Sequence, residues 1–95
     1  MKILALESEL KNFIGEDYSK VLMEEAKIIF DLYKQNIIRE IYFNDKHCAV
    51  IVLECDSLDH CKSILSTLPL VDKGYIAFEI MELKPYTGFD RIIKE

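Results

Sequence analysis

The order in which strand-like and helix-like patterns follow one another limits the fold of this chain more than any other feature of its sequence. Apolar and β-forming residues run through four short segments, which are residues 2–8, 37–43, 47–55 and 75–83. Apolar residues at helical spacing mark two further segments, which are residues 18–36 and 57–68. The predicted order is therefore strand, helix, strand, strand, helix, strand.

This order predicts an α+β fold of the ferredoxin-like βαββαβ type, with a four-stranded antiparallel sheet and two helices on one face. The chain has 95 residues, which is a common length for one domain. No repeat, low-complexity stretch or linker interrupts the sequence. We therefore expect residues 1–95 to form a single domain.

Local signals set the ends of the predicted elements. Asp17 is placed to cap the first helix, and Asn36 suits a left-handed residue at its end. Ser57 is a good N-cap for the second helix. Pro69 is predicted to end that helix, with residues 70–74 as a loop.

Each predicted helix carries an apolar stripe that we expect to be buried. The stripe of the first helix consists of Leu22, Ala26, Ile29, Phe30 and Tyr33, and it is widened by Val21, Ile28 and Leu32. The stripe of the second helix consists of Leu58, Cys61, Ile64, Leu65 and Leu68.

The strands are apolar on both sides, although two helices can cover only one face of a sheet. Either alternating set of side chains fits the face that meets the helices. An apolar sheet face left in water is unfavourable at about 25 cal/mol per Å². The sequence therefore predicts that two copies pack sheet against sheet as a homo-oligomer, in the arrangement of a dimeric α+β barrel.

The overall charge and hydropathy exclude several classes of partner. The net charge is -5, and the twelve basic residues are scattered, so we expect no nucleic-acid partner. No 18-residue apolar run predicts a membrane span, and the N-terminal run lacks the length of a signal peptide. The three cysteines favour reduced thiols, and we expect a cytoplasmic protein.

Four short stretches resemble the muconolactone isomerase family. They are Arg39-Glu40-Ile41-Tyr42, His47, Asp56-Ser57-Leu58 and Leu68-Pro69-Leu70. The resemblance implies a ferredoxin-like fold, oligomers built from dimers, no cofactor, and a double-bond shift in an unsaturated lactone that carries a carboxymethyl group. Authentic isomerases have Arg-His-Leu-Trp where this chain has Arg39-Glu40-Ile41-Tyr42, so the resemblance leaves the identity of the small lactone or acid open.

Such a double-bond shift needs a base, an acid, a donor to the enolate oxygen and a cation for an anionic substrate. Glu40 is the predicted base, and His47 is a second group that could move protons. Tyr42 lies two residues from Glu40, on the same side of the strand, and is the predicted oxyanion donor. Arg39 is the predicted substrate anchor.

Each of these residues also has an ordinary structural explanation. Arg39 and Glu40 could form surface ion pairs, Tyr42 could pack in the sheet, and His47 could lie on the surface beside a turn. Two further residues, Tyr86 and Phe89, are predicted to bind substrate at a pocket mouth or to pack against a neighbouring subunit.

Two imidazoles and three thiols occur in the chain, but their spacing matches no metal-binding motif, so no metal site is predicted. Two alternatives to an isomerase remain open at this point. One is a binding or structural module without catalysis, and the other is a cofactor-free monooxygenase on the same barrel fold.

Overall fold

The computed structural model describes residues 1–12 and 18–93, and it confirms the predicted fold class. Four antiparallel strands form one sheet in the order β2-β3-β1-β4. They are β1 (Lys2–Glu9), β2 (Ile38–Phe43), β3 (Ala49–Glu54) and β4 (Ile76–Leu83). The helices are α1 (Tyr18–Lys34), α2 (Leu58–Leu65), α3 (Pro69–Asp72) and the 3-10 helix η1 (Gly88–Arg91). Within the described ranges, no helix is both long and apolar enough to cross a lipid bilayer.

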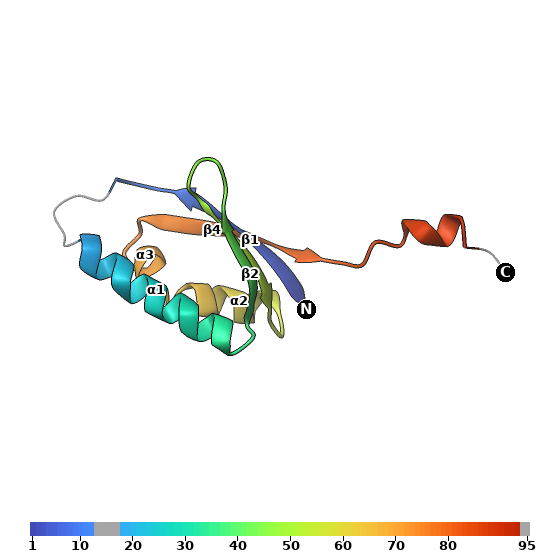
Figure 1. Ribbon diagram of the computed structural model, residues 1–95, viewed down its shortest axis with the longest axis horizontal. Coiled ribbons are helices and arrows are strands. Elements are labelled where there is room, and N and C mark those ends of the chain that lie inside the picture. The colour runs from blue at the N-terminus through green and yellow to red at the C-terminus, as the bar shows by residue number, and fades with distance from the viewer. Residues whose placement is uncertain (13–17, 94–95) are drawn as a thin grey trace.

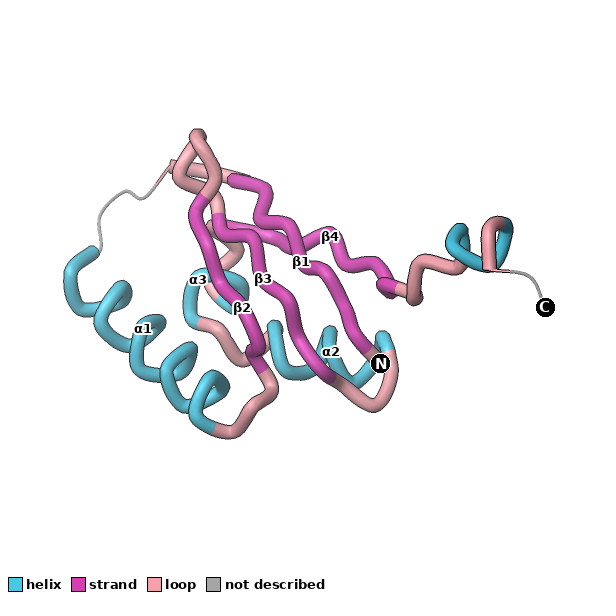
Figure 2. The backbone as a smooth tube through the Cα atoms, turned by 45° about the vertical axis from the view of Figure 1, so that its right-hand side comes forward, coloured by secondary structure: helices cyan, strands magenta, loops and turns pink. Residues whose placement is uncertain are grey.

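The helices α1, α2 and α3 all lie on one side of the sheet, as Figures 1 and 2 show from two directions. Fully buried side chains alternate along the central strands on that side, and they are Ile3, Ala5, Ile51 and Leu53. The opposite side, called the open face here, carries half-buried apolar side chains, which are Leu4, Leu6, Val50, Val52, Ala77 and Met81. The register therefore settles which set of alternating residues faces the helices.

The helix α1 packs through a different stripe from the one that its sequence first suggests. Val21 and Leu32 are buried and Ile28 is half-buried, whereas Phe30 and Tyr33 are 58% and 52% exposed. The expectation that the Leu22–Tyr33 stripe is buried was therefore wrong for most of its members. The predicted capping residue Asp17 lies outside the described residues. Asn36 has a φ of 63°, which confirms a left-handed residue after the helix.

Pro69 starts a helix and does not simply end one. The helix α2 ends at Leu65, and Pro69 is the first residue of α3. The prediction that residues 70–74 form a loop was therefore wrong for the part that belongs to α3. Proline is tolerated at this position because its missing N–H has no partner in the first turn of a helix. The Ser57 side chain accepts a hydrogen bond from the His60 amide, which confirms the predicted N-cap of α2.

The turn between β2 and β3 is longer than its sequence predicted. The strand β3 begins at Ala49, so the expected opening of that strand at His47 was wrong. The Asn44 side chain accepts hydrogen bonds from the amides of Lys46 and Cys48 and closes the turn. His47 has a φ of 62°, a left-handed conformation that histidine adopts more readily than most residues.

Replacing Ile3 by valine tests the packing beneath the helices. Ile3 is fully buried on the central strand β1, so loss of one methylene group should lower the free energy of unfolding by about 0.5–1.5 kcal/mol. Urea denaturation followed by circular dichroism at a fixed protein concentration measures this change. The same substitution at half-buried Ile37 is the control and should cost less. An equal or larger loss at Ile37 would contradict this view of the core.

Candidate functional site

A groove of about 870 Å³ lies between α1 and the sheet edge formed by β2 and β3. This volume is in the range of small-molecule sites in proteins. Apolar side chains make up much of its wall, and they are Leu22, Ala26, Ile29, Phe30, Tyr33, Ile41, Phe43, Ala49, Ile51, Leu70 and Phe78. The exposed stripe of α1 therefore forms one wall of the groove, which explains why those apolar residues do not pack on the sheet.

Two carboxylates from different elements lie in this apolar groove. Glu25 on α1 is only 7% exposed, and Glu7 on β1 is half-buried. Glu25 Oε1 accepts a hydrogen bond of 3.0 Å from the amide of Leu70. Glu7 Oε1 accepts one of 3.1 Å from the amide of Ala49. Backbone amides from α3 and β3 thus hold carboxylates from α1 and β1 in place.

The environment of Glu25 favours its protonated form. Burial raises the pKa of this carboxyl above its ordinary value of 4.5, and the nearby charge of Glu7 raises it further. The hydrogen bond from the Leu70 amide acts in the opposite direction and only partly compensates. A carboxyl group with a raised pKa in an apolar site can both accept and return a proton, which is the property required of a general base or acid.

The raised pKa of Glu25 predicts a specific dependence of stability on pH. The folded chain binds this proton more tightly than the unfolded chain, so the stabilisation is fully present below pH 4.5. As the pH rises through the folded-state pKa, the free energy of unfolding should fall. The variant Glu25→Gln lacks this titration but keeps an oxygen that can accept from the Leu70 amide.

Urea denaturation of the wild type and of Glu25→Gln at a series of pH values measures this effect. The wild type should lose stability relative to the variant as the pH increases above 4.5. Comparing the two proteins at each pH removes the contribution of every other titrating group. A difference in stability that stays constant across the series would contradict the raised pKa.

Four predicted site residues border the groove: Arg39, Glu40, Tyr42 and His47. Tyr42 donates a hydrogen bond of 2.8 Å to Glu40 Oε1, which confirms that the two side chains share one side of β2. All four residues are exposed in the single chain. This hydrogen bond to Glu40, and after it the Glu40 charge, raises the pKa of the Tyr42 hydroxyl above its ordinary value. The His47 ring stacks on Phe43 with the ring centroids 4.0 Å apart.

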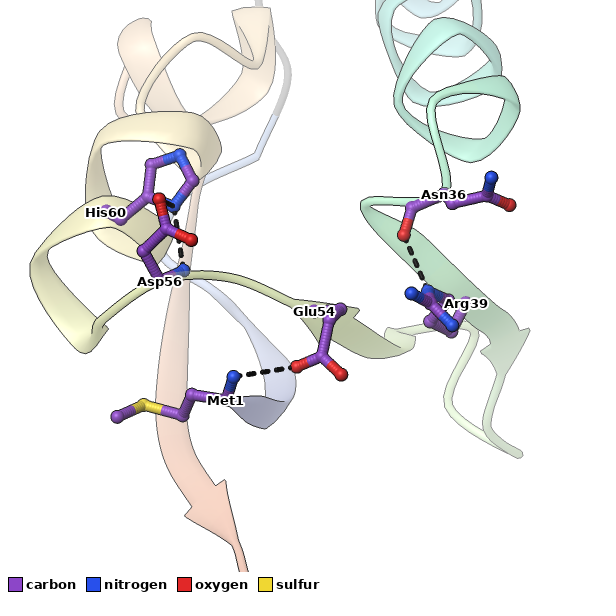
Figure 3. A network of polar contacts seen from close by, with 6 residues as sticks. All are labelled: Met1, Asn36, Arg39, Glu54, Asp56 and His60. Carbon is purple, nitrogen blue, oxygen red and sulfur yellow. Dashed lines mark hydrogen bonds and ion pairs between the residues drawn. The ribbon is translucent and has the colours of Figure 1, made fainter.

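Arg39 has a polar partner that is not an acid. The register of β2 shifts between Ile38 and Glu40, so Arg39 lies in a β-bulge. Its Nε donates to the carbonyl of Asn36 at 2.6 Å (Figure 3). Glu54 is paired instead with the amine of Met1 at 2.8 Å, which holds the pKa of the Glu54 carboxyl below its ordinary value. Among the described residues, none forms an ion pair with Arg39, although the Arg39 charge contributes to the lowered pKa of Glu54; Arg39 also borders the groove.

Tyr86 and Phe89 do not lie in the groove of their own chain. They belong to the segment that follows β4 and runs away from the sheet in Figure 1. Their rings pack edge to face with centroids 5.0 Å apart, and both side chains are exposed. The structure therefore brings four of the predicted residues to the groove and separates these two from it.

Glu25 and Glu7 are the site residues that sequence reasoning missed. Glu25 falls on the buried stripe of α1, at helical spacing between Val21 and Leu32. A charged residue within an otherwise apolar stripe was the signal in the sequence that could have found it. No comparable signal marked Glu7, because its role depends on the pairing of β1 with β3.

The cysteines offer no reactive group to this site. Burial raises the pKa of the Cys61 thiol to about 12 and raises that of Cys55 as well. The pKa of Cys48 is also raised, by burial and by the charges of Glu7 and Glu9. All three are therefore thiols near neutral pH. In the described part of the chain, no three His, Cys, Asp or Glu side chains come together as a metal site.

The comparisons with known proteins bear on the fold. No family model and no curated protein matches the sequence. Muconolactone isomerase superimposes with a TM-score of 0.78 over 92% of both chains, at 16% sequence identity. This chain has the fold of muconolactone isomerase. The predicted resemblance to that family is thus confirmed at the level of structure.

A second solved structure shares the same architecture. It is the 5-chloro-2-hydroxyhydroquinone dehydrochlorinase from Burkholderia phenoliruptrix in complex with 2,5-dihydroxybenzoquinone. The TM-score is 0.62 and the sequence identity 15%, and the match covers 93% of this chain and 98% of the other. Because one fold carries many activities, these two likenesses establish the architecture and leave the reaction to the residues of the groove.

Proposed function

We propose that this protein is a cofactor-independent isomerase that shifts a double bond in a small unsaturated lactone or acid. The observation that carries the proposal is the buried carboxyl of Glu25, held by the Leu70 amide in an apolar groove beside Glu7. Such an environment brings the protonated and ionised forms closer in energy near neutral pH. It is the arrangement expected of a group that takes a proton from carbon and gives it back.

The reaction moves one proton and needs no oxidant or reductant. The Glu25 carboxylate removes a proton from the saturated carbon at the far end of the conjugated C=C–C=O system, and the electron pair moves through the double bond onto the carbonyl oxygen to form a dienolate. The same carboxyl then returns the proton at another carbon, so the double bond changes position. Because the groove excludes much of the solvent around Glu25, the proton can stay with this carboxyl between the two steps.

Of the other predicted residues at the groove, Arg39 and His47 keep supporting roles in this proposal. Arg39 binds the carboxylate of the substrate, since none of the described residues forms an ion pair with it. Tyr42 and Glu40 lie opposite Val50 and Val52 of the open face, so their side chains are on the other side of β2 from Glu25, and the proposal gives them no step in the proton transfer. His47 lies at the same rim and serves as a second proton carrier.

The names of the two structural neighbours are consistent with proton transfer. One is an isomerase of a lactone, and the other removes hydrogen chloride from a substituted hydroquinone. Both types of reaction can start when a base takes a proton from the substrate. This agreement supports proton transfer as the type of reaction.

The proposal includes a homodimer in which two open faces pack together. The half-buried side chains Leu4, Leu6, Val50 and Val52 form the centre of this face. No helix in the described residues lies on that side (Figures 1 and 2). Packing two such faces removes apolar area from water in both copies.

Deuterium exchange tests the proposed chemistry directly. The purified protein is incubated with muconolactone in deuterated water, and the protons of the lactone are followed by NMR. Protein-dependent deuterium uptake or migration of the double bond is the expected result. If the lactone stays unchanged at high protein concentration over hours, muconolactone is not a substrate.

A parallel incubation with 5-chloro-2-hydroxyhydroquinone, followed by chloride release, then separates two outcomes. If chloride is released but the lactone does not exchange, the reaction of this protein would be an elimination that uses the same base, and not a double-bond shift. Absence of both reactions would overturn the proposed isomerase and favour a binding module without catalysis.

A further inference from the structure

The carboxyl of Glu25 lies towards one end of the groove. It accepts a hydrogen bond from the amide of Leu70, and the carbonyl of Leu70 accepts one from the amide of Tyr75. Leu70 and Tyr75 also border a smaller cavity of about 170 Å³, together with Cys48 in the turn between β2 and β3. The end of the groove where the proposed proton transfer takes place is therefore the end nearest this turn.

Arg39 is held at the other end, where the chain passes from α1 into β2. Its Nε donates to the carbonyl of Asn36, the left-handed residue that follows α1 (Figure 3). This hydrogen bond ties the guanidinium group to the junction between the helix and the strand. Glu25 and Arg39 therefore bind their backbone partners at opposite ends of the groove, and neither side chain reaches towards the other.

The strand wall gives one measure of the distance between these two ends. Arg39 is four residues before Phe43 on β2, and Phe43 pairs with Ala49. The amide of Ala49 binds the carboxylate of Glu7, so Phe43 lies level with the acidic end of the groove. Four residues of a strand span about 13 Å, which the bulge at Arg39 shortens slightly.

The helix wall gives a second measure, and the two agree. Glu25 and Tyr33 are eight residues apart, and Tyr33 is the last residue of α1 that borders the groove. Eight residues of a helix rise by about 12 Å. Both walls therefore separate the carboxyl that moves the proton from the cation that binds the substrate by on the order of 10 Å.

The wall between the two ends is apolar on the side of the helices. Glu40 and Tyr42 belong to this stretch of β2, but they lie opposite Val52 and Val50 and so point to the open face. The side chains that border the middle of the groove are Ala26, Ile29 and Phe30 on α1 and Ile41 and Ile51 on the strands. A part of the substrate that lies along this wall is therefore expected to be hydrocarbon.

A carboxymethyl group is short for this arrangement. A base approaches its proton, and a guanidinium group its carboxylate, to about 3 Å each. Of the 12–13 Å between the two ends, roughly 6 Å is then left for the substrate to span between its reacting carbon and its carboxylate. A single methylene group covers only a small part of this length.

We propose that the substrate is an unsaturated lactone or acid whose carboxylate is carried on an apolar chain several methylene groups long, and that this chain lies along the groove wall between Glu25 and Arg39. The inference rests on the proposed function, which makes Glu25 the base and Arg39 the anchor. The chain takes no part in the chemistry, and Phe30 and Ile41 are the residues that recognise it. Muconolactone then binds as the shortest and weakest member of a series.

Saturated lactones test the chain length without any turnover. They lack the conjugated double bond and cannot react, and their acid chain is lengthened one methylene group at a time from the carboxymethyl compound. NMR titration of the isotope-labelled protein gives each dissociation constant and follows the Nε–H of Arg39 and the amide of Leu70. The affinity should increase about fourfold for each added methylene group until the chain spans the groove. Both signals should shift together only for chains that span it.

Phe30→Ala and Met23→Ala form a matched pair of variants for the same titrations. Both side chains are apolar residues of α1, 58% and 59% exposed, but only Phe30 borders the groove. Phe30→Ala should reduce the gain in affinity for each methylene group and leave the binding of the carboxymethyl compound nearly unchanged. Met23→Ala should bind the whole series like the wild type. The methyl ester of a long-chain lactone should bind more weakly and should not shift the Arg39 signal.

An affinity that does not increase with chain length would overturn the inference, as would an equal increase in Phe30→Ala and the wild type. A full shift of the Arg39 signal with the carboxymethyl compound would overturn it as well. None of these outcomes depends on deuterium uptake, because the saturated lactones do not react. A wrong chain length is thus distinguishable from a failure of the proposed isomerase.

Discussion

Glu25→Gln is expected to lower the rate of deuterium uptake into the lactone by about 10²–10⁴-fold, the usual contribution of a general acid or base. Glutamine has nearly the shape of glutamate and keeps an acceptor for the Leu70 amide, so the groove should retain its form. It cannot accept a proton at any pH used for the assay. The variant should therefore bind the substrate and fail in the proton transfer, which lowers kcat more than it raises KM.

Glu24→Gln is the matched control for this experiment. Glu24 precedes Glu25 on α1 but is exposed and does not border the groove. The control should keep nearly the full rate of exchange. A rate in Glu25→Gln equal to that of the control would remove Glu25 from the chemistry. If Glu40→Gln lost the activity in its place, the base would be the residue that the sequence had predicted.

Leu4→Glu is expected to dissociate the proposed dimer while each chain stays folded. Leu4 pairs with Val52 and Met81 at the centre of the open face and is only half-buried in the single chain. The new carboxylate is solvated in the monomer but would be buried without a partner in the dimer. An uncompensated buried charge costs about 3–5 kcal/mol. This corresponds to a dimer dissociation constant raised by roughly 10²–10³-fold or more.

Sedimentation velocity over a range of protein concentrations measures this shift, and circular dichroism checks that the fold is kept. Met23→Glu is the control, because it adds the same charge to an exposed apolar position on α1. The control should sediment like the wild type. An unchanged oligomer in Leu4→Glu would mean that copies associate through another surface.

The sequence was sufficient to predict the fold because the signals for each element were local. The order of strands and helices, the Ser57 cap and the left-handed Asn36 all depend on residues close together in the chain. The errors arose where two local rules compete. Proline breaks a helix when it lies in the interior, but it is favoured at the first position of a helix. Which of the two rules applies at Pro69 depends on the backbone conformation after Leu68, where α3 begins.

The site was predicted less completely because its parts meet only in three dimensions. Arg39, Glu40, Tyr42 and His47 are close in sequence, and they were found together at one rim of the groove. Glu25 depends instead on an amide of α3, forty-five residues away, and this contact leaves no pattern in the sequence. The sequence was also insufficient to predict which apolar residues of α1 are buried. Apolar residues at helical spacing mark both a packed face and the wall of a groove, and periodicity does not separate the two.

One face of the helix α1 stabilises the fold, and another face shapes the groove. Val21 and Leu32 are buried and hold the helix to the sheet. Leu22, Phe30 and Tyr33 are exposed and border the groove, so their replacement should change the stability of the fold little. Exposed substitutions usually change the free energy of unfolding by no more than about 0.5 kcal/mol. Mutations along the groove wall can therefore accumulate without unfolding the chain. A lineage with this helix can move from one substrate to another by single steps, keeping Glu25 and its backbone support unchanged.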